Sequence, residues 1–222
     1  MKKLTLLSAA ALLAVSASAQ VEKTYKQKGY TLNFTNTDAT LDSALQERMI
    51  KTFFEVYPKL SKEYNKNTEK IVYMKIDTAY KGVAATGNAH VRISPKWMHQ
   101  HPEDIDVITH EVMHIVQNYG NSVGPGWLTE GIADYARNQF GVNNPAAKWS
   151  LGEYKAGQNY TNSYRITARF LLWIETKVKK GIVKELDKEM RDHTYTDAVW
   201  TSQTGKTLDE LWAAYVANPS LS

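Results

Sequence analysis

The sequence of 222 residues contains no cysteine. Disulfide bonds, thiol catalysis and cysteine-based metal sites are therefore all excluded. Without disulfides the chain must rely on its hydrophobic core, and 6 Trp and 13 Tyr offer large apolar surfaces for one. The sequence also shows no repeats, linkers or low-complexity stretches, which favours a single folded unit.

Long apolar runs are missing except at the N-terminus. There, Lys2 and Lys3 precede an apolar run from Leu4 to Val15, and Ala17-Ser18-Ala19 fits a cleavage site. The run is too short to span a bilayer, and no later segment could span one. We therefore expect a signal peptide at 1–19, export to the periplasm or the medium, and a single domain at 20–222.

A strong excess of charge is absent as well. The chain has 27 basic and 23 acidic residues. Loss of Lys2 and Lys3 with the signal peptide leaves 25 basic residues and a net charge of only +2. Nothing in this balance calls for a nucleic-acid partner.

The most informative motif is His110-Glu111-Val112-Met113-His114. Residues four apart share one face of a helix, so the two histidines can bind one metal ion. Glu111 is then close enough to accept a proton from a water molecule at that metal. This is the H-E-x-x-H pattern of zinc-dependent hydrolases. The alternative is two surface histidines on an amphipathic helix, which the downstream sequence disfavours.

Catalytic zinc needs a third protein ligand. The metzincin pattern would place it at position 120, but Gln117 and Gly120 stand where that pattern has glycine and histidine. A turn-rich segment at 120–126 instead predicts a chain reversal into a second helix. Glu130 lies in the first turns of that helix and is our predicted third ligand.

Asp134 lies four residues after Glu130, on the same helix face. Metal-bound histidines usually donate their other N–H to a carboxylate or a carbonyl. We therefore predict that Asp134 holds His110 in place rather than binding the metal. A solvated acidic stripe is the alternative for Glu130 and Asp134. Apolar residues surround both, and unpaired buried carboxylates are unfavourable.

The chain resembles the plant basic secretory protein family and its bacterial relatives, which are gluzincin-type peptidases. The resemblance runs from about Tyr30 to about Tyr215. It is carried by four stretches, HEVMHIVQ at 110–117, GWLTEGIADYAR at 126–137, YRITARFLL at 164–172 and GKTLDELWAAY at 205–215. It implies a zincin-like fold with His110, His114 and Glu130 as zinc ligands and Glu111 as general base.

A further hydrogen-bond donor should stabilise the oxyanion of a peptidase reaction. Tyr164 resembles the tyrosine of the family's G-Y-x-x-T-A motif, with Ser163 in place of the glycine. We predict Tyr164 as this catalytic residue, with Tyr160 and Arg165 as rivals. A packed core tyrosine is the other interpretation.

The fold class that we predict is α+β, with a small N-terminal sheet and helices followed by a mostly helical C-terminal half. Alternation predicts strands at 30–36, 70–77 and 89–94, with a turn-like break at 82–87. A helical rhythm covers 41–64, with Asp38 as its cap. The helix that carries His110 and His114, called the metal helix below, should start near Pro102. Further helices are expected at 127–140, 163–178, 183–190 and 208–216.

Strand 89–94 lies just before the metal helix and is our candidate for pairing with an extended substrate. Nearby His90, His99 and His101 lack a supporting carboxylate pattern, so we predict no second metal there. The function indicated is a secreted zinc metallopeptidase acting on peptides or proteins. The alternative is a secreted zinc-containing binding protein of the same fold, although binding alone has no use for Glu111. The sequence does not indicate an oligomeric state.

Overall fold

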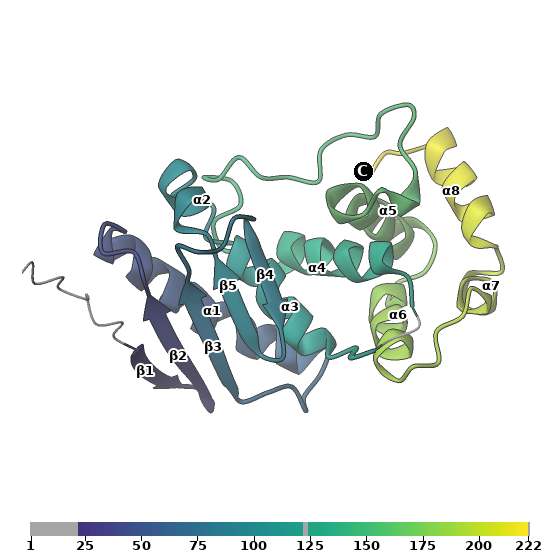
Figure 1. Ribbon diagram of the computed structural model, residues 1–222. Helices are drawn as coiled ribbons and strands as arrows, with labels where there is room; N and C mark the ends of the chain where they lie inside the picture. Colours follow the sequence, from purple (N-terminus) through teal and green to yellow (C-terminus); the bar gives the residue numbers. More distant parts are fainter. Residues whose placement is uncertain (1–21, 122–123, 222) are drawn as a thin grey trace, which may run out of the picture.

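A computed structural model describes residues 22–121 and 124–221; the predicted signal peptide lies outside them. The fold is α+β, with a five-stranded sheet in the N-terminal half and a mostly helical C-terminal half (Figure 1). This confirms the fold class predicted from the sequence. The strand order is β1-β2-β3-β5-β4, and the strands are β1 (Glu22–Gln27), β2 (Tyr30–Asn36), β3 (Ile71–Ile76), β4 (Ala84–Gly87) and β5 (His90–Ile93).

One face of the sheet is buried against α1 (Ser43–Glu63). In β2 the alternate residues Tyr30, Leu32 and Phe34 are buried. The parallel register with β3 sets Leu32 beside Val72, so both strands present apolar side chains to the same layer. Helix α1 adds its buried apolar face to the same core. Its cap is Asp42, which accepts the Leu45 N–H, and not Asp38 as we predicted.

The edge of the sheet next to the metal helix is β4, which corrects two predictions. The segment 82–87 was expected to be a turn-like break, because small residues such as Ala84 have low strand propensity. It pairs antiparallel with β5 through a two-residue turn at Asn88 and Ala89, both with positive φ. The predicted substrate strand is β5, which lies between β3 and β4 and has no free edge.

The metal helix is α3 (Val107–Gln117), and it starts later than we predicted. Residues from Pro102 to Asp106 form turns, and the buried Asp106 carboxylate accepts N–H groups from the distant residues Val142 and Asn143. That long-range contact decides the start of the helix. Almost every residue of α3 is buried, so the metal helix lies at the centre of the molecule.

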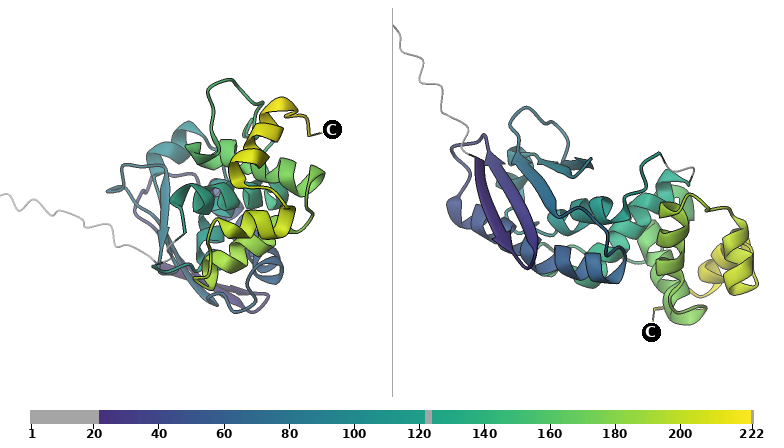
Figure 2. Two further views of the ribbon diagram at one scale, coloured as in Figure 1. Left: turned by 90° about the vertical axis from the view of Figure 1, so that its right-hand side faces the viewer. Right: turned by 90° about the horizontal axis from the view of Figure 1, so that it is seen from below.

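Helices α4 to α8 form the C-terminal half, which lies to the right of the sheet in Figure 1 and in the right-hand view of Figure 2. The sequence did not predict α2, α7, the 3₁₀ turn η1 or β1. Among the described residues, no helix is long and apolar enough to cross a membrane. The bounds are α2 (Pro95–Gln100), α4 (Gly126–Phe140), η1 (Tyr160–Asn162), α5 (Tyr164–Lys177), α6 (Ile182–Arg191), α7 (Ala198–Thr204) and α8 (Leu208–Ala217).

Candidate metal centre

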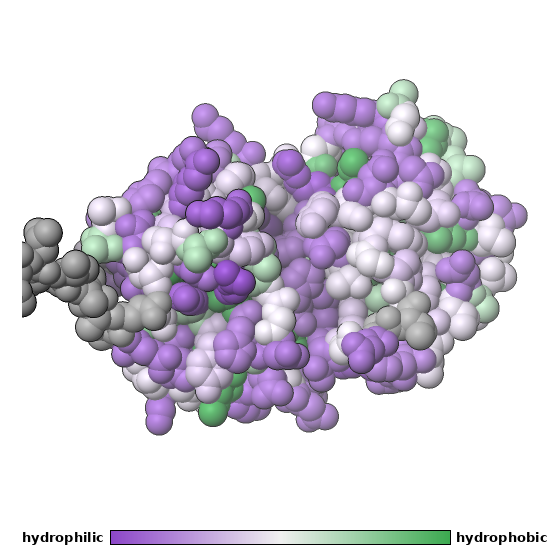
Figure 3. Space-filling model, viewed as in Figure 1, coloured by the Kyte–Doolittle hydropathy of each residue, from purple (hydrophilic) through white to green (hydrophobic). Residues whose placement is uncertain are grey.

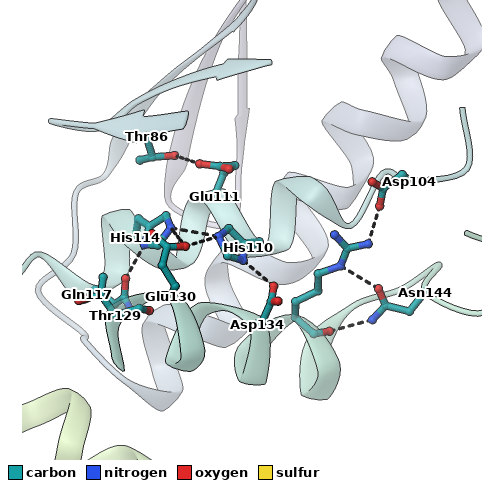
Figure 4. Close-up of polar contacts among 11 residues, drawn as sticks. Thr86, Asp104, His110, Glu111, His114, Gln117, Thr129, Glu130, Asp134 and Asn144 are labelled. Carbon is teal, nitrogen blue, oxygen red and sulfur yellow. Dashed lines mark hydrogen bonds and ion pairs between the residues drawn. The ribbon is translucent and has the colours of Figure 1, made fainter. Parts of the chain in front are cut away.

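Three side chains from α3 and α4 converge on one point (Figure 4). The Nε2 atoms of His110 and His114 lie 3.2 Å apart. Glu130 Oε2 lies 3.2 Å from the first of these nitrogens and 3.7 Å from the second. The spacing of four residues along α3 places both imidazoles on one face, and α4 brings Glu130 to that face.

The opposite nitrogen of each histidine ring is also engaged. Nδ1 of His110 lies 2.7 Å from Asp134 Oδ1. Nδ1 of His114 lies 2.6 Å from Gln117 Oε1. An ionised carboxylate can only accept, so His110 donates its Nδ1–H to Asp134 and its Nε2 faces Glu130. Asp134 thus has the contact that we predicted for it.

This donor set suits a metal ion. Two imidazole nitrogens and a carboxylate oxygen face one another, all of them groups that accept protons or bind cations. Two histidines, one glutamate and an open side match a catalytic zinc site. Among the described residues, these three are the one group of His, Asp and Glu side chains close enough to hold a metal.

The electrostatics favour a positive charge here. Burial by itself would lower the pKa of His110, but its hydrogen bonds with Asp134 and Glu130 outweigh burial and raise the pKa to about 10. Burial and the neighbouring charge of His110 lower the pKa of His114. The site therefore favours a single positive charge, while His114 stays neutral, as a metal ligand must be.

The Glu111 side chain points from α3 towards the sheet. Its Oε2 accepts a hydrogen bond of 2.7 Å from the Thr86 hydroxyl on the edge strand β4. Both residues line a cleft of about 1420 Å³ that also contains the three converging side chains. Figure 3 shows this side of the molecule hollowed between the sheet and the helical half.

Tyr164 lines the same cleft and is 54 % exposed, unusual for a large aromatic residue. Its ring centroid lies 6.0 Å from that of His110. The negative charge of Glu130 is the main cause that raises the pKa of Tyr164, so its hydroxyl keeps its proton at neutral pH. Of the two rivals, Arg165 also lines the cleft, whereas the Tyr160 hydroxyl donates to Asp209.

Two polar residues at the site were not singled out by the sequence, Thr86 and Gln117. Gln117 was considered only as a departure from the metzincin pattern. Its position three residues after His114 could have indicated a contact between the two side chains, since residues i and i+3 share a helix face. Thr86 gave no signal, because only the folded sheet brings it to Glu111. Of the three histidines near strand 89–94, His99 pairs with Asp38, His90 stacks on Tyr73 and His101 lies against Trp97.

Comparison with solved structures finds 41 similar chains. An M1 zinc metallopeptidase from Deinococcus radiodurans superposes with a TM-score of 0.53 at 14 % identity, covering 88 % of this chain and 51 % of that one. A mutant of it bound to a Tyr-Ser-Ala substrate gives the same values. A further mutant structure gives 0.51 at 13 % identity, covering 91 % and 53 %. This chain thus spans about half the length of these enzymes, and the likeness shows the fold alone.

A comparison with curated proteins finds no match by sequence. The family described as "Peptidase of plants and bacteria" matches over residues 11–215, nearly the whole chain. The match includes all four stretches that carried the resemblance to basic secretory proteins. The zincin-like fold and the converging His110, His114 and Glu130 agree with it. The chain therefore belongs to this family of peptidases of plants and bacteria.

Proposed function

We propose that this chain is a zinc-dependent peptidase in which His110, His114 and Glu130 hold the metal. The convergence of two imidazole nitrogens and a carboxylate oxygen at 3.2–3.7 Å carries the proposal. Glu111 lies beside these three residues in a cleft large enough for a peptide. Family membership supports peptidase chemistry.

A zinc ion at this centre would supply Lewis-acid chemistry, lowering the pKa of a water molecule and polarising a peptide carbonyl. Glu111 acts as general base: it accepts the proton of the attacking water and returns it to the leaving amine. The Thr86 hydroxyl orients the Glu111 carboxylate through the contact at Oε2. Tyr164, exposed at the cleft and protonated, donates a hydrogen bond to the oxyanion.

The substrate is an extended peptide segment that pairs with β4. This strand is the last in the sheet order, and its residues line the cleft. A free strand edge offers backbone N–H and C=O groups at regular spacing, which an extended peptide can match. We therefore propose β4, rather than the strand predicted at 89–94, as the strand that pairs with the substrate.

Replacing Glu111 with glutamine tests the proposal. The amide cannot accept the proton, so we expect peptide hydrolysis to fall by about 10²–10⁴-fold while zinc content stays unchanged. Glu47→Gln, at an exposed position on α1, is the matched control and should keep full activity. Zinc content and cleavage of an unbiased peptide library are measured together.

Wild-type hydrolysis in Glu111→Gln would contradict the mechanism. Zinc binding by the wild type without any cleavage of the library would favour the rival function, a zinc-containing binding protein.

We further propose that the protein is exported, with residues 20–222 as one zincin-like domain. The motif at 17–19 supports cleavage after Ala19, and a single hydrophobic core that joins both halves supports the single domain. N-terminal sequencing of the protein from the medium or periplasm should start at Gln20. An uncleaved cytoplasmic product would refute export.

A further inference from the structure

The side chain of Gln117 lies between the two helices that carry the converging residues (Figure 4). It is the last residue of α3 and is only 1 % exposed. The chain leaves the helix immediately afterwards, at Asn118, whose φ is +45°. Gln117 is therefore fixed by burial at the end of α3 that faces the start of α4.

Both ends of the Gln117 amide have a partner. Nε2 donates a hydrogen bond of 2.9 Å to the backbone carbonyl of Thr129, the residue before Glu130. A carbonyl only accepts, so the NH₂ group must face Thr129 and Oε1 must face His114. Oε1 lies 2.6 Å from His114 Nδ1, and that nitrogen must therefore carry the proton. The Nε2 lone pair of His114 is then left for a metal.

We propose that Gln117 is a positioning residue that holds two of the three zinc ligands at once, His114 directly and Glu130 through its backbone. This inference rests on the proposed zinc site. Asp134, in contrast, contacts the ligand His110 alone among the three. A glutamine is suited to this place because it accepts from one group and donates to another, whereas a carboxylate can only accept.

The test is the dissociation constant for zinc, measured by competition with a chelator. Gln117→Met keeps the length of the side chain and removes both hydrogen bonds. We expect zinc to bind about 10–100-fold more weakly, the usual effect of removing a group that orients a ligand. Gln46→Met is the matched control, because Gln46, on α1, also donates to a backbone carbonyl, that of Leu41. It should leave the zinc constant unchanged.

Melting of the metal-free protein separates positioning from simple structural support. A lower melting temperature of Gln117→Met with wild-type zinc affinity would overturn the proposal. Gln117→Glu tests the second contact, since it keeps the acceptor for His114 but sets an oxygen against the Thr129 carbonyl. We expect this variant to bind zinc more weakly than the wild type, and equal or tighter binding would overturn the link to Glu130.

These outcomes are distinct from failure of the proposed function. A wild-type protein that binds no zinc would refute the zinc site itself. A wild type that binds zinc, with Gln117→Met binding it equally well, would refute only the role of Gln117.

Discussion

At the scale of single residues, the backbone at the start of α5 is strained. Ser163 has φ +67° and ψ −180°, a region populated almost only by glycine. The next residue, Tyr164, has φ +50°. Glycine, which the motif that this chain resembles has in place of Ser163, would adopt these angles without strain. The strained pair places the Tyr164 ring beside His110.

Ser163→Gly should therefore stabilise the protein. The free energy gained by relieving the strain exceeds the cost of the larger conformational entropy that glycine gives the unfolded chain. We expect the free energy of unfolding to rise by about 1–2 kcal/mol. The Ser163 side chain makes no capping hydrogen bond to α5, so its loss costs little. The melting temperature should rise by roughly 2–8 °C, measured by thermal unfolding. Ser163→Ala keeps the strain and is the control; an equal rise in both variants would contradict this explanation.

The converging residues themselves could be predicted from the sequence because their spacing is local. His110 and His114 are one turn apart, and Glu130 and Asp134 are one turn apart on the next helix. Thr86 could not be found in this way, because its partner Glu111 is 25 residues away and meets it only through the sheet. Strain at Ser163 also required the backbone angles, although the replaced glycine pointed to the position.

At the scale of elements, the contact between α4 and α5 depends on Gly131. A Cβ atom at this position would lie 2.3 Å from Thr167 Cγ2 and 2.7 Å from Thr167 Cβ. Thr167 is fully buried and its hydroxyl donates to the Tyr160 carbonyl, so it cannot easily move away. Gly131 follows Glu130 directly. The close approach of the two helices therefore also fixes the position of Glu130.

Gly131→Ala should separate the two helices. We expect overpacking to lower the free energy of unfolding by about 1–3 kcal/mol, which exceeds the gain in helix propensity from glycine to alanine. Zinc binding should weaken as well. Gly126→Ala is the matched control on the same helix, because a Cβ there meets nothing within 4 Å. Unfolding and zinc titration of both variants provide the measurement. Equal stability of Gly131→Ala and Gly126→Ala would show that the helices can adjust.

Elements with strong periodicity were predicted well, and those decided by distant contacts were not. Strand β2 was predicted with its observed bounds, and α4 to within one residue, because their apolar patterns are regular. The edge strand β4 is made of small residues and becomes a strand through pairing with β5. The start of α3 depends on Asp106 binding a segment some 36 residues further on.

At the scale of the whole molecule, the site lies where the two halves meet. The sheet contributes Thr86, α3 contributes His110, Glu111 and His114, and the helical half contributes Glu130 and Tyr164. The order of strands before helices predicted the α+β class. The shape of the cleft could not be predicted, because it depends on how the two halves pack.

The central claim is one zinc ion per chain at His110, His114 and Glu130. The most direct measurement is the zinc content of the purified wild-type protein beside that of His110→Ala. We expect one zinc per wild-type chain and loss of stoichiometric zinc in the variant, because two remaining ligands do not complete a zinc site. A wild-type protein that takes up no zinc, or a variant that retains it fully, would contradict the account.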